Sequence, residues 1–436
     1  MARVRCSSAL GLSFKFQGFA VALLLVLSSV GSAQDTRNVT EPVIPRSCRA
    51  LAARPDSSEH QLDTTRLQQA IDHCKFGEAV ELKADGANNV FLSGALDIRP
   101  GVTLLIDRGV TLFASRDPKA FDTGSGTCGT VDENGRGCRA LINGDHADHS
   151  AVMGEGTIDG RGGEILIGRH ISWWDLAQQA KVTNKNQNCP RLIVLSHSND
   201  FRLYKITLRN SPNFHVYFGQ GDGFTAWGVT IDSPKTSRNT DGIDPGNATN
   251  VTITHCSIHA GDDNVAIKAG GEGASRNMTI AHNHFLTGHG MSIGSDTDAG
   301  VSHIRVTDLT IDGADNGIRI KSNSSRGGIV EDVVYQDVQI RNTKNPILMD
   351  THYSFYGTDR DKLPVFRDII LRHVEISGGG KITFDGYDAA HRLQMTLDGV
   401  TVADPVTISA QHADLTFGPG PVNLNVSGED VQVKRH

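Results

Sequence analysis

The sequence has few aromatic residues and no excess of positive charge. Aromatic residues make up 6% of its 436 residues, although 38% of the chain is hydrophobic. This apolar fraction is large enough for a folded core, which excludes an intrinsically disordered chain. The formal net charge of −7 argues against the basic footprint that binding to a nucleic acid requires, so we expect no nucleic-acid partner.

The sequence also lacks an apolar run of the roughly 20 residues that a membrane span needs. The longest run, residues 19–27, follows three basic residues and precedes Gly31-Ser32-Ala33. This order of charged, apolar and small residues is typical of a secretory signal peptide. We therefore expect residues 1–33 to be removed, leaving a single domain, residues 34–436, that is extracellular (or periplasmic in transit) and not bound to a membrane.

Cysteine is scarce and has none of the spacings of a zinc site. One of the seven cysteines lies in the signal peptide, and no Cys-x-x-Cys pair or histidine cluster is present, so we expect no structural metal. Six cysteines allow many pairings, and we predict disulfides between nearest neighbours. These are Cys48 with Cys74 and Cys128 with Cys138. Cys189 and Cys256 either form a third bridge or remain free thiols.

Helical periodicity is confined to one short segment near the mature N-terminus. Its apolar positions recur at i, i+3, i+4 and i+7: Leu67, Ala70, Ile71 and Cys74. This spacing predicts a short helix, and Asp63 or Thr64 is placed to cap it. From Val80 onward helical periodicity disappears, and short apolar runs alternate with turns rich in Gly, Asn, Asp and Ser, which predicts strands.

The apolar runs recur in pairs. The first runs of the central pairs begin at Asn250, Asn277, His303 and Asp332, which are 27, 26 and 29 residues apart. A unit of this length cannot bury its own apolar face, but stacked units bury a continuous one, so we predict an all-β, right-handed single-stranded parallel β-helix of about ten coils. The N-terminal helix would close one end. A β-sandwich is the alternative, but it does not explain the period.

Stacking places residues of successive coils side by side, about 4.8 Å apart. The shorter second runs are aligned on their first apolar residues, Ile243, Val265, Met291 and Ile318. The column two residues before these anchors contains Asp241, Asp263, His289 and Asn316. Asp262 adjoins this column, and Arg319 and Lys321 follow the last anchor. We expect the glycines around the column to supply a bend.

Carboxylates this close together can divide the work of glycoside hydrolysis. One acts as a protonated acid and another as an ionised base on a water molecule, because like charges raise the pKa of at least one member. Arg319 and Lys321 would hold an anionic group of the substrate. Asp in solenoid corners often only bonds the turn backbone; the shared register of four titratable side chains is what favours catalysis here.

Four ordered segments at these positions resemble the motifs of glycoside hydrolase family 28, the polygalacturonases. They are Asn239-Thr-Asp241, Gly261-Asp-Asp263, Gly288-His-Gly290 and Arg319-Ile-Lys321. The resemblance is closest to bacterial secreted endopolygalacturonases. It implies a parallel β-helix that hydrolyses the α-1,4 bonds of polygalacturonate (de-esterified pectin) with inversion and without a cofactor.

The resemblance also implies a role for each site residue. Asp262 is expected to be the general acid, Asp241 and Asp263 to activate the water, and His289 to tune these acids. Substrate binding is expected at Arg319, Lys321, Asn239, Lys268 and Tyr353. Polygalacturonate is the expected partner, and the protein is expected to be a monomer.

Several alternatives remain open. Within the family, an exo-polygalacturonase, a rhamnogalacturonan hydrolase or a xylogalacturonan hydrolase is possible; endo action is favoured because the chain lacks an added N-terminal domain and long insertions. A calcium-dependent pectate lyase would use the same kind of fold. A non-catalytic carbohydrate-binding solenoid, such as an adhesin, would not require the acid cluster.

Overall fold

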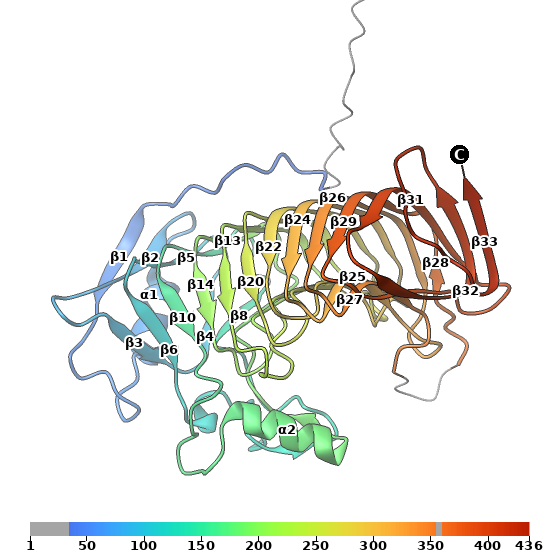
Figure 1. Cartoon of the computed structure of the whole chain (residues 1–436). Helices are drawn as coiled ribbons and strands as arrows, with labels where there is room; N and C mark the ends of the chain where they lie inside the picture. Colours follow the sequence, from blue (N-terminus) through green and yellow to red (C-terminus); the bar gives the residue numbers. More distant parts are fainter. Residues whose placement is uncertain (1–34, 355–359, 436) are drawn as a thin grey trace, which may run out of the picture. The chain divides into compact units, whose positions relative to one another are not determined.

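A computed structural model describes residues 35–354 and 360–435, which form a parallel β-helix (Figure 1). Strands from successive coils pair in parallel ladders that run along the β-helix. Crossovers between parallel strands are right-handed, and the predicted all-β, right-handed parallel β-helix is confirmed. The predicted signal peptide, residues 1–33, lies outside the described residues.

One ladder, which we call the site ladder, contains the short second runs of the repeat. Its strands are β4 (Leu96–Asp97), β8 (Ile142–Asp145), β12 (Ile193–Ser196), β15 (Val216–Gly219), β18 (Ile243–Gly246), β21 (Val265–Ile267), β23 (Met291–Ile293), β25 (Asn316–Lys321), β27 (Asn345–Asp350), β30 (Gly380–Asp385) and the first part of β32 (Val406–Phe417). Val265 lies opposite Ile243 on one side and Met291 on the other. Met291 in turn lies opposite Ile318. All four side chains are buried, so the predicted alignment of the second runs is confirmed.

A second ladder contains the longer first runs. Its strands are β1 (Ser47–Ala52), β2 (Ala79–Lys83), β5 (Thr103–Ile106), β9 (Ala151–Met153), β13 (Phe201–Tyr204), β16 (Asp222–Trp227), β19 (Thr249–Thr254), β22 (Ser275–Phe285), β24 (Val301–Asp312), β26 (Ile329–Arg341), β28 (Val365–Phe366), β29 (Ile369–Ser377), β31 (Leu393–Val402), the last part of β32, and β33 (Glu429–Arg435). Ile304 lies opposite Met278 on one side and Val333 on the other. These three side chains are fully buried, so alternate residues of each strand face the core.

A third ladder covers the N-terminal coils. Its strands are β3 (Val90–Ser93), β6 (Thr111–Ala114), β10 (Thr157–Asp159), β14 (Thr207–Arg209), β17 (Thr230–Asp232) and β20 (Ser257–His259), and β20 pairs with the end of β22. The inward side chains of all three ladders belong to one continuous apolar core. The outward side chains of the site ladder are therefore held on a rigid support.

The predicted N-terminal helix is confirmed as α1 (Thr64–His73). It lies at the N-terminal end of the β-helix (Figure 1), and Leu67, Ala70 and Ile71 are buried in the core. Asp63 occupies the N-cap position, but its side chain makes no capping hydrogen bond. The Asp63 carboxylate is instead paired with Arg54 and Arg66.

The prediction that no helical periodicity follows Val80 is wrong. Helix α2 (Trp173–Thr183) projects from the β-helix (Figure 1). Ser172 and Asp175 form a reciprocal capping box at its start. The buried positions follow helical spacing: Trp173, Leu176, Ala177 and Ala180. Both signals were present in the sequence. No helix of the described ranges is long and apolar enough to cross a membrane.

The cysteines behave as the nearest-neighbour pairing predicts. The disulfides are Cys48–Cys74 and Cys128–Cys138. Cys189 and Cys256 are buried free thiols, so of the two alternatives left by the sequence, the one without a third bridge is correct. Burial raises the pKa of both thiols, that of Cys256 to about 12, and both therefore remain protonated and unreactive.

Candidate active site

The site ladder brings the predicted acids together on neighbouring coils. Asp241 precedes β18, Asp262 and Asp263 precede β21, and His289 precedes β23. The side chains of Asp241 and Asp263 are 6% and 2% exposed, whereas that of Asp262 is 21% exposed. Asp262 is therefore the member of the carboxylate cluster (Asp241, Asp262 and Asp263) that a substrate reaches most easily.

Asp263 is held by hydrogen bonds from three side chains. Arg319 Nη1 lies 3.0 Å from its Oδ1, Lys321 Nζ lies 2.8 Å from its Oδ2, and the Ser292 hydroxyl donates to Oδ1 at 2.7 Å. Burial by itself would raise the pKa of Asp263, but the charges of Lys321 and Arg319 outweigh it and hold the pKa well below its usual value. Asp263 is therefore ionised. Sequence reasoning missed Ser292 because its partner, Asp263, lies 29 residues earlier in the chain, on the neighbouring coil.

Asp262 interacts directly with the predicted histidine. His289 Nδ1 lies 3.0 Å from Asp262 Oδ1 and 4.0 Å from Asp263 Oδ1. Burial opposes ionisation of Asp262, but the hydrogen bond with His289 and the positive charge of Lys321 more than offset it, and they lower the pKa of Asp262. In the unliganded site this carboxyl is ionised above its lowered pKa.

Asp241 has the opposite electrostatic environment. Burial, followed by the charges of Asp244 and Asp262, raises the pKa of Asp241 well above its usual value. Its Oδ1 atom has no hydrogen-bond partner among the described residues. The nearest cation, Lys268, lies 3.6 Å from Asp241 Oδ2 but only 2.6 Å from Asp244 Oδ2. Asp241 is thus the carboxyl of the cluster that binds a proton most tightly.

Lys268 was predicted to bind substrate, and its contacts show a further task. Its ion pair with the fully buried Asp244 compensates a charge that sequence reasoning did not single out. The fully buried His215 donates through Nδ1 to the backbone carbonyl of Asp241 at 2.9 Å, and its Nε2 accepts from the Ser233 hydroxyl at 2.9 Å. Because that carbonyl can only accept, Nδ1 carries the proton. Burial lowers the pKa of His215 to about 4, so this histidine is a neutral support.

Tyr353 lies beside the two predicted carboxylate-binding cations. The guanidinium of Arg319 lies 5.3 Å from the centre of its ring, and Lys321 Nζ lies 5.2 Å from it. The structure therefore places Tyr353, Arg319 and Lys321 together beside Asp263; their roles in substrate binding stay predictions. Both cations are almost fully buried and are engaged with Asp263.

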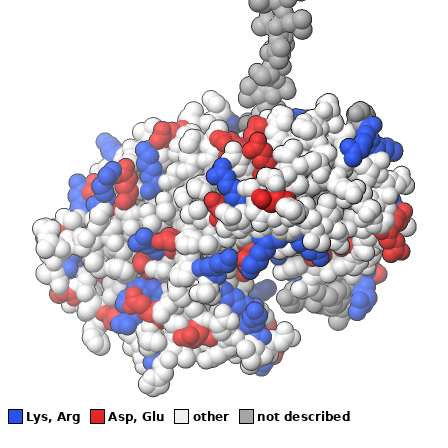
Figure 2. Space-filling model, in the orientation of Figure 1, with Lys and Arg blue, Asp and Glu red and all other residues white. Residues whose placement is uncertain are grey.

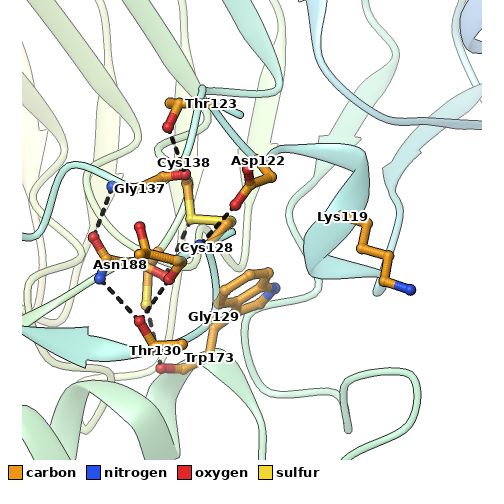
Figure 3. The surroundings of a disulfide bond; sticks show 12 residues. Lys119, Asp122, Thr123, Cys128, Gly129, Thr130, Gly137, Cys138, Trp173 and Asn188 are labelled. Atoms are coloured by element: carbon orange, nitrogen blue, oxygen red, sulfur yellow. Dashed lines mark hydrogen bonds between the residues drawn. A yellow bond between two sulfur atoms is a disulfide. The ribbon is translucent and has the colours of Figure 1, made fainter. Parts of the chain in front are cut away.

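Asn239 is linked to a projecting segment rather than to the acids. Its Oδ1 accepts a hydrogen bond from Gln187 at 3.1 Å, and Gln187 belongs to β11 (Asn186–Gln187), which pairs antiparallel with β7 (Val131–Asp132). The adjacent Asn188 accepts from the backbone of Gly137 at 2.7 Å, close to the Cys128–Cys138 disulfide (Figure 3). The disulfide segment therefore supports the side of the site that carries Asn239.

The glycine predicted to bend the chain before β23 is required for steric reasons. Gly290 has φ +70°, and a Cβ atom on it would lie 2.2 Å from the carbonyl oxygens of Asn316 and Gly317. Gly313 has a similar φ of +77°, but a Cβ atom there would meet nothing within 4 Å. A side chain at Gly313 would therefore meet only backbone strain, whereas a side chain at Gly290 would meet both backbone strain and steric overlap.

We expect Gly290→Ala to unfold the acid site, whereas Gly313→Ala should cost only about 1–2 kcal/mol, the usual penalty for a side chain in the left-handed region. The difference arises because the Gly290 variant must displace the backbone of the neighbouring coil. Thermal denaturation of both variants, followed by circular dichroism, measures it. Equal losses in the two variants would show that the coil contact at Gly290 is not tight.

The acid cluster is poorly suited to a divalent cation. Ligand atoms of Asp262, Asp263 and His289 lie within 4.8 Å of one another. However, Asp263 already accepts from Arg319 and Lys321, and their charges repel a cation at this place. Calcium prefers six to eight oxygen ligands, which this set does not offer.

Comparison with known proteins agrees with the geometry of the site. Residues 89–414 match the sequence profile of glycosyl hydrolases family 28. The chain belongs to this family. The resemblance found in the four motifs is thus confirmed, and all four motifs lie inside the matched range.

Individual members of family 28 are similar over most of the chain. An endo-polygalacturonase of Pectobacterium carotovorum subsp. carotovorum is 45% identical over 389 residues, covering 89% of this chain and 94% of that protein. A polygalacturonase of Ralstonia nicotianae is 42% identical and covers 89% of this chain and 83% of its own length. The solved polygalacturonase of Erwinia carotovora ssp. carotovora superposes with a TM-score of 0.84 at 44% identity, covering 87% of this chain and 99% of that chain.

Proposed function

We propose that the protein is a secreted, monomeric endo-polygalacturonase, which hydrolyses the α-1,4 bonds of polygalacturonate by inverting acid/base catalysis. The observation that carries this proposal is the carboxylate cluster, in which the pKa of Asp241 is raised and that of Asp263 is lowered. Carboxyls whose environments separate their pKa values supply an acid and a base at one pH. Similarity to proteins named endo-polygalacturonase supports the substrate and the endo mode.

The cluster keeps one proton available at mildly acidic pH. In the unliganded site this proton resides on Asp241, and Asp262 is ionised beside His289. Binding of a polyanionic sugar chain adds negative charge and displaces water at the partly exposed Asp262, and both effects raise the pKa of Asp262. The proton then moves to Asp262, and Asp241 becomes an ionised base. The carboxyls share the proton as a group.

In the catalytic step, Asp262 donates its proton to the glycosidic oxygen as the bond to the anomeric carbon breaks. A water molecule attacks this carbon from the opposite face and gives a proton to Asp241, while the permanently ionised Asp263 orients the water. One proton leaves Asp262 and one is gained by Asp241, so the cluster returns to its starting charge. Attack from the opposite face inverts the configuration.

One face of the molecule carries a charge pattern that suits an anionic polymer. Figure 2 shows Lys and Arg atoms in a band across the middle of one face, with Asp and Glu atoms between them. A local band of cations attracts a uronate chain although the whole protein is acidic. Arg319, Lys321 and Tyr353 would contact the sugar next to the bond that is cleaved.

Digestion of polygalacturonate, with and without a chelator, tests the proposal. We expect a ladder of oligomers early in the reaction, no unsaturated ultraviolet-absorbing ends, and the same rate after chelation, because the acids act without a metal. Monomer or dimer alone would indicate exo action. Unsaturated ends that require calcium would indicate a lyase and would overturn the hydrolase mechanism.

A further inference from the structure

A fourth cation, besides Arg319, Lys321 and Lys268, lies beside the site ladder, upstream of the acids. Arg191 stands two residues before Ile193, which pairs with Val216, and Val216 pairs with Ile243. Arg191 therefore occupies the same column position as Asp241, two coils away. At about 4.8 Å for each coil, the two backbones are about 10 Å apart, a distance that a short run of sugar units can bridge.

The guanidinium of Arg191 is held between two aromatic rings. Its Cζ atom lies 4.5 Å from the centre of the Phe214 ring and 5.0 Å from that of Tyr217. Tyr217 itself packs on two glycines, since a Cβ atom would lie 2.6 Å from its ring at Gly219 and 2.9 Å from its hydroxyl oxygen at Gly246. Stacking of this kind fixes the plane of a guanidinium and leaves its N–H groups at the edge free to donate.

Those N–H groups have no hydrogen-bond or ion-pair partner among the described residues. Burial lowers the pKa of Arg191, and the more distant charges of Asp244 and Asp241 only partly offset this effect. The group stays charged, because arginine does not lose its proton in proteins. By contrast, Arg319 and Lys321 bind Asp263, and Lys268 binds Asp244.

We propose that Arg191 binds the carboxylate of a uronate unit of the substrate, two coils away from the carboxylate cluster. A flat, fixed guanidinium with free N–H groups matches the two oxygens of a carboxylate. The half-buried position strengthens this contact relative to one in open solvent. The site so defined sets specificity for an acidic sugar at a distance from the cleaved bond, and it rests on the proposed function.

The test compares Arg191→Gln and Arg191→Lys with the wild type on galacturonate oligomers of increasing length. Loss of a charge-assisted pair should raise KM about 10- to 100-fold for Arg191→Gln and less for Arg191→Lys, which keeps the charge but not the fork. The kcat should stay within about twofold, since the acids are untouched. The losses should appear only with oligomers long enough to reach Arg191, because a disturbed acid site would slow all lengths equally.

Arg276→Gln, at an exposed position of β22, is the matched control and should leave KM unchanged. A second arm measures binding of the same oligomers by calorimetry in the inactive Asp262→Asn background, where the Arg191→Gln variant should bind about 10- to 100-fold more weakly. If the wild type cleaves no oligomer, the proposed function fails while the binding arm still tests Arg191. Unchanged KM and unchanged affinity in both Arg191 variants would overturn the inference, whether or not the proposed function is correct.

Discussion

Asp262→Asn is expected to lower kcat by about 10²- to 10⁴-fold, the usual contribution of a general acid, with little change in KM. An amide cannot donate a proton to the glycosidic oxygen at a useful rate, but it has nearly the same shape and can still hydrogen bond to His289. Asp262 is the most exposed carboxyl of the cluster, so no other member replaces it at the leaving oxygen. Initial rates of reducing-end release from polygalacturonate measure the effect.

The control for this variant is Asp85→Asn, which changes the same functional group at an exposed position on a turn near the N-terminal end. It should retain the wild-type rate. Equal thermal midpoints of the Asp262→Asn variant and the wild type would show that the site remains folded. A folded Asp262→Asn variant with the wild-type kcat would transfer the role of acid to another carboxyl, with Asp241 as the first candidate because of its raised pKa.

The register of the β-helix could be predicted from the sequence because each coil repeats the same inward positions. Once Ile243, Val265 and Met291 are aligned, the period-2 geometry of strands places Asp241 and Asp263 side by side without any knowledge of tertiary structure. The pairing of these strands confirms that alignment. In a repeat protein, contacts between neighbouring coils can be predicted by aligning consecutive repeats of the sequence.

The pKa shifts of the acids and their ion pairs could not be predicted, because they depend on distances between side chains of different coils. Burial and the neighbouring carboxylates raise the pKa of Asp241, whereas the hydrogen bond with His289 outweighs burial and lowers the pKa of Asp262. Sequence gives the residue types but not these surroundings. The substrate-binding role of Lys268 stays a prediction, but its ion pair with Asp244 could not be predicted because it crosses from one coil to the next. Helix α2 is a different case, since its signals were in the sequence but lay inside an insertion between strands.

Asp241→Asn is expected to inactivate the enzyme and to make it more stable at neutral pH. The wild-type carboxyl is buried with an Oδ1 atom that lacks a hydrogen-bond partner among the described residues, and its pKa is raised. A raised folded-state pKa means that the ionised form is destabilised by the fold. The neutral amide removes that cost, about 1–3 kcal/mol for a buried group without a partner, but it cannot accept a proton from water.

The pH dependence of this gain follows from the sign of the shift. In the wild type, ionised Asp241 destabilises the fold fully above its folded-state pKa. This destabilisation disappears as the pH falls to about 4, the pKa of Asp in an unfolded chain. The difference in thermal midpoint between Asp241→Asn and the wild type should therefore shrink from pH 7 to pH 4. A gain that is independent of pH would mean that ionisation of Asp241 is not its cause.

Asp263→Asn is the matched comparison, because it makes the same chemical change one coil away in the opposite electrostatic environment. Here the folded-state pKa is lowered, so the ionised carboxylate stabilises the fold above pH 4 and its loss leaves Arg319 and Lys321 without a counter-charge. Removing one partner of a buried ion pair costs about 3–5 kcal/mol. We therefore expect two inactive variants whose thermal midpoints at pH 7 move in opposite directions. Movement in the same direction would contradict the division of the cluster into one proton-binding and one permanently ionised carboxyl.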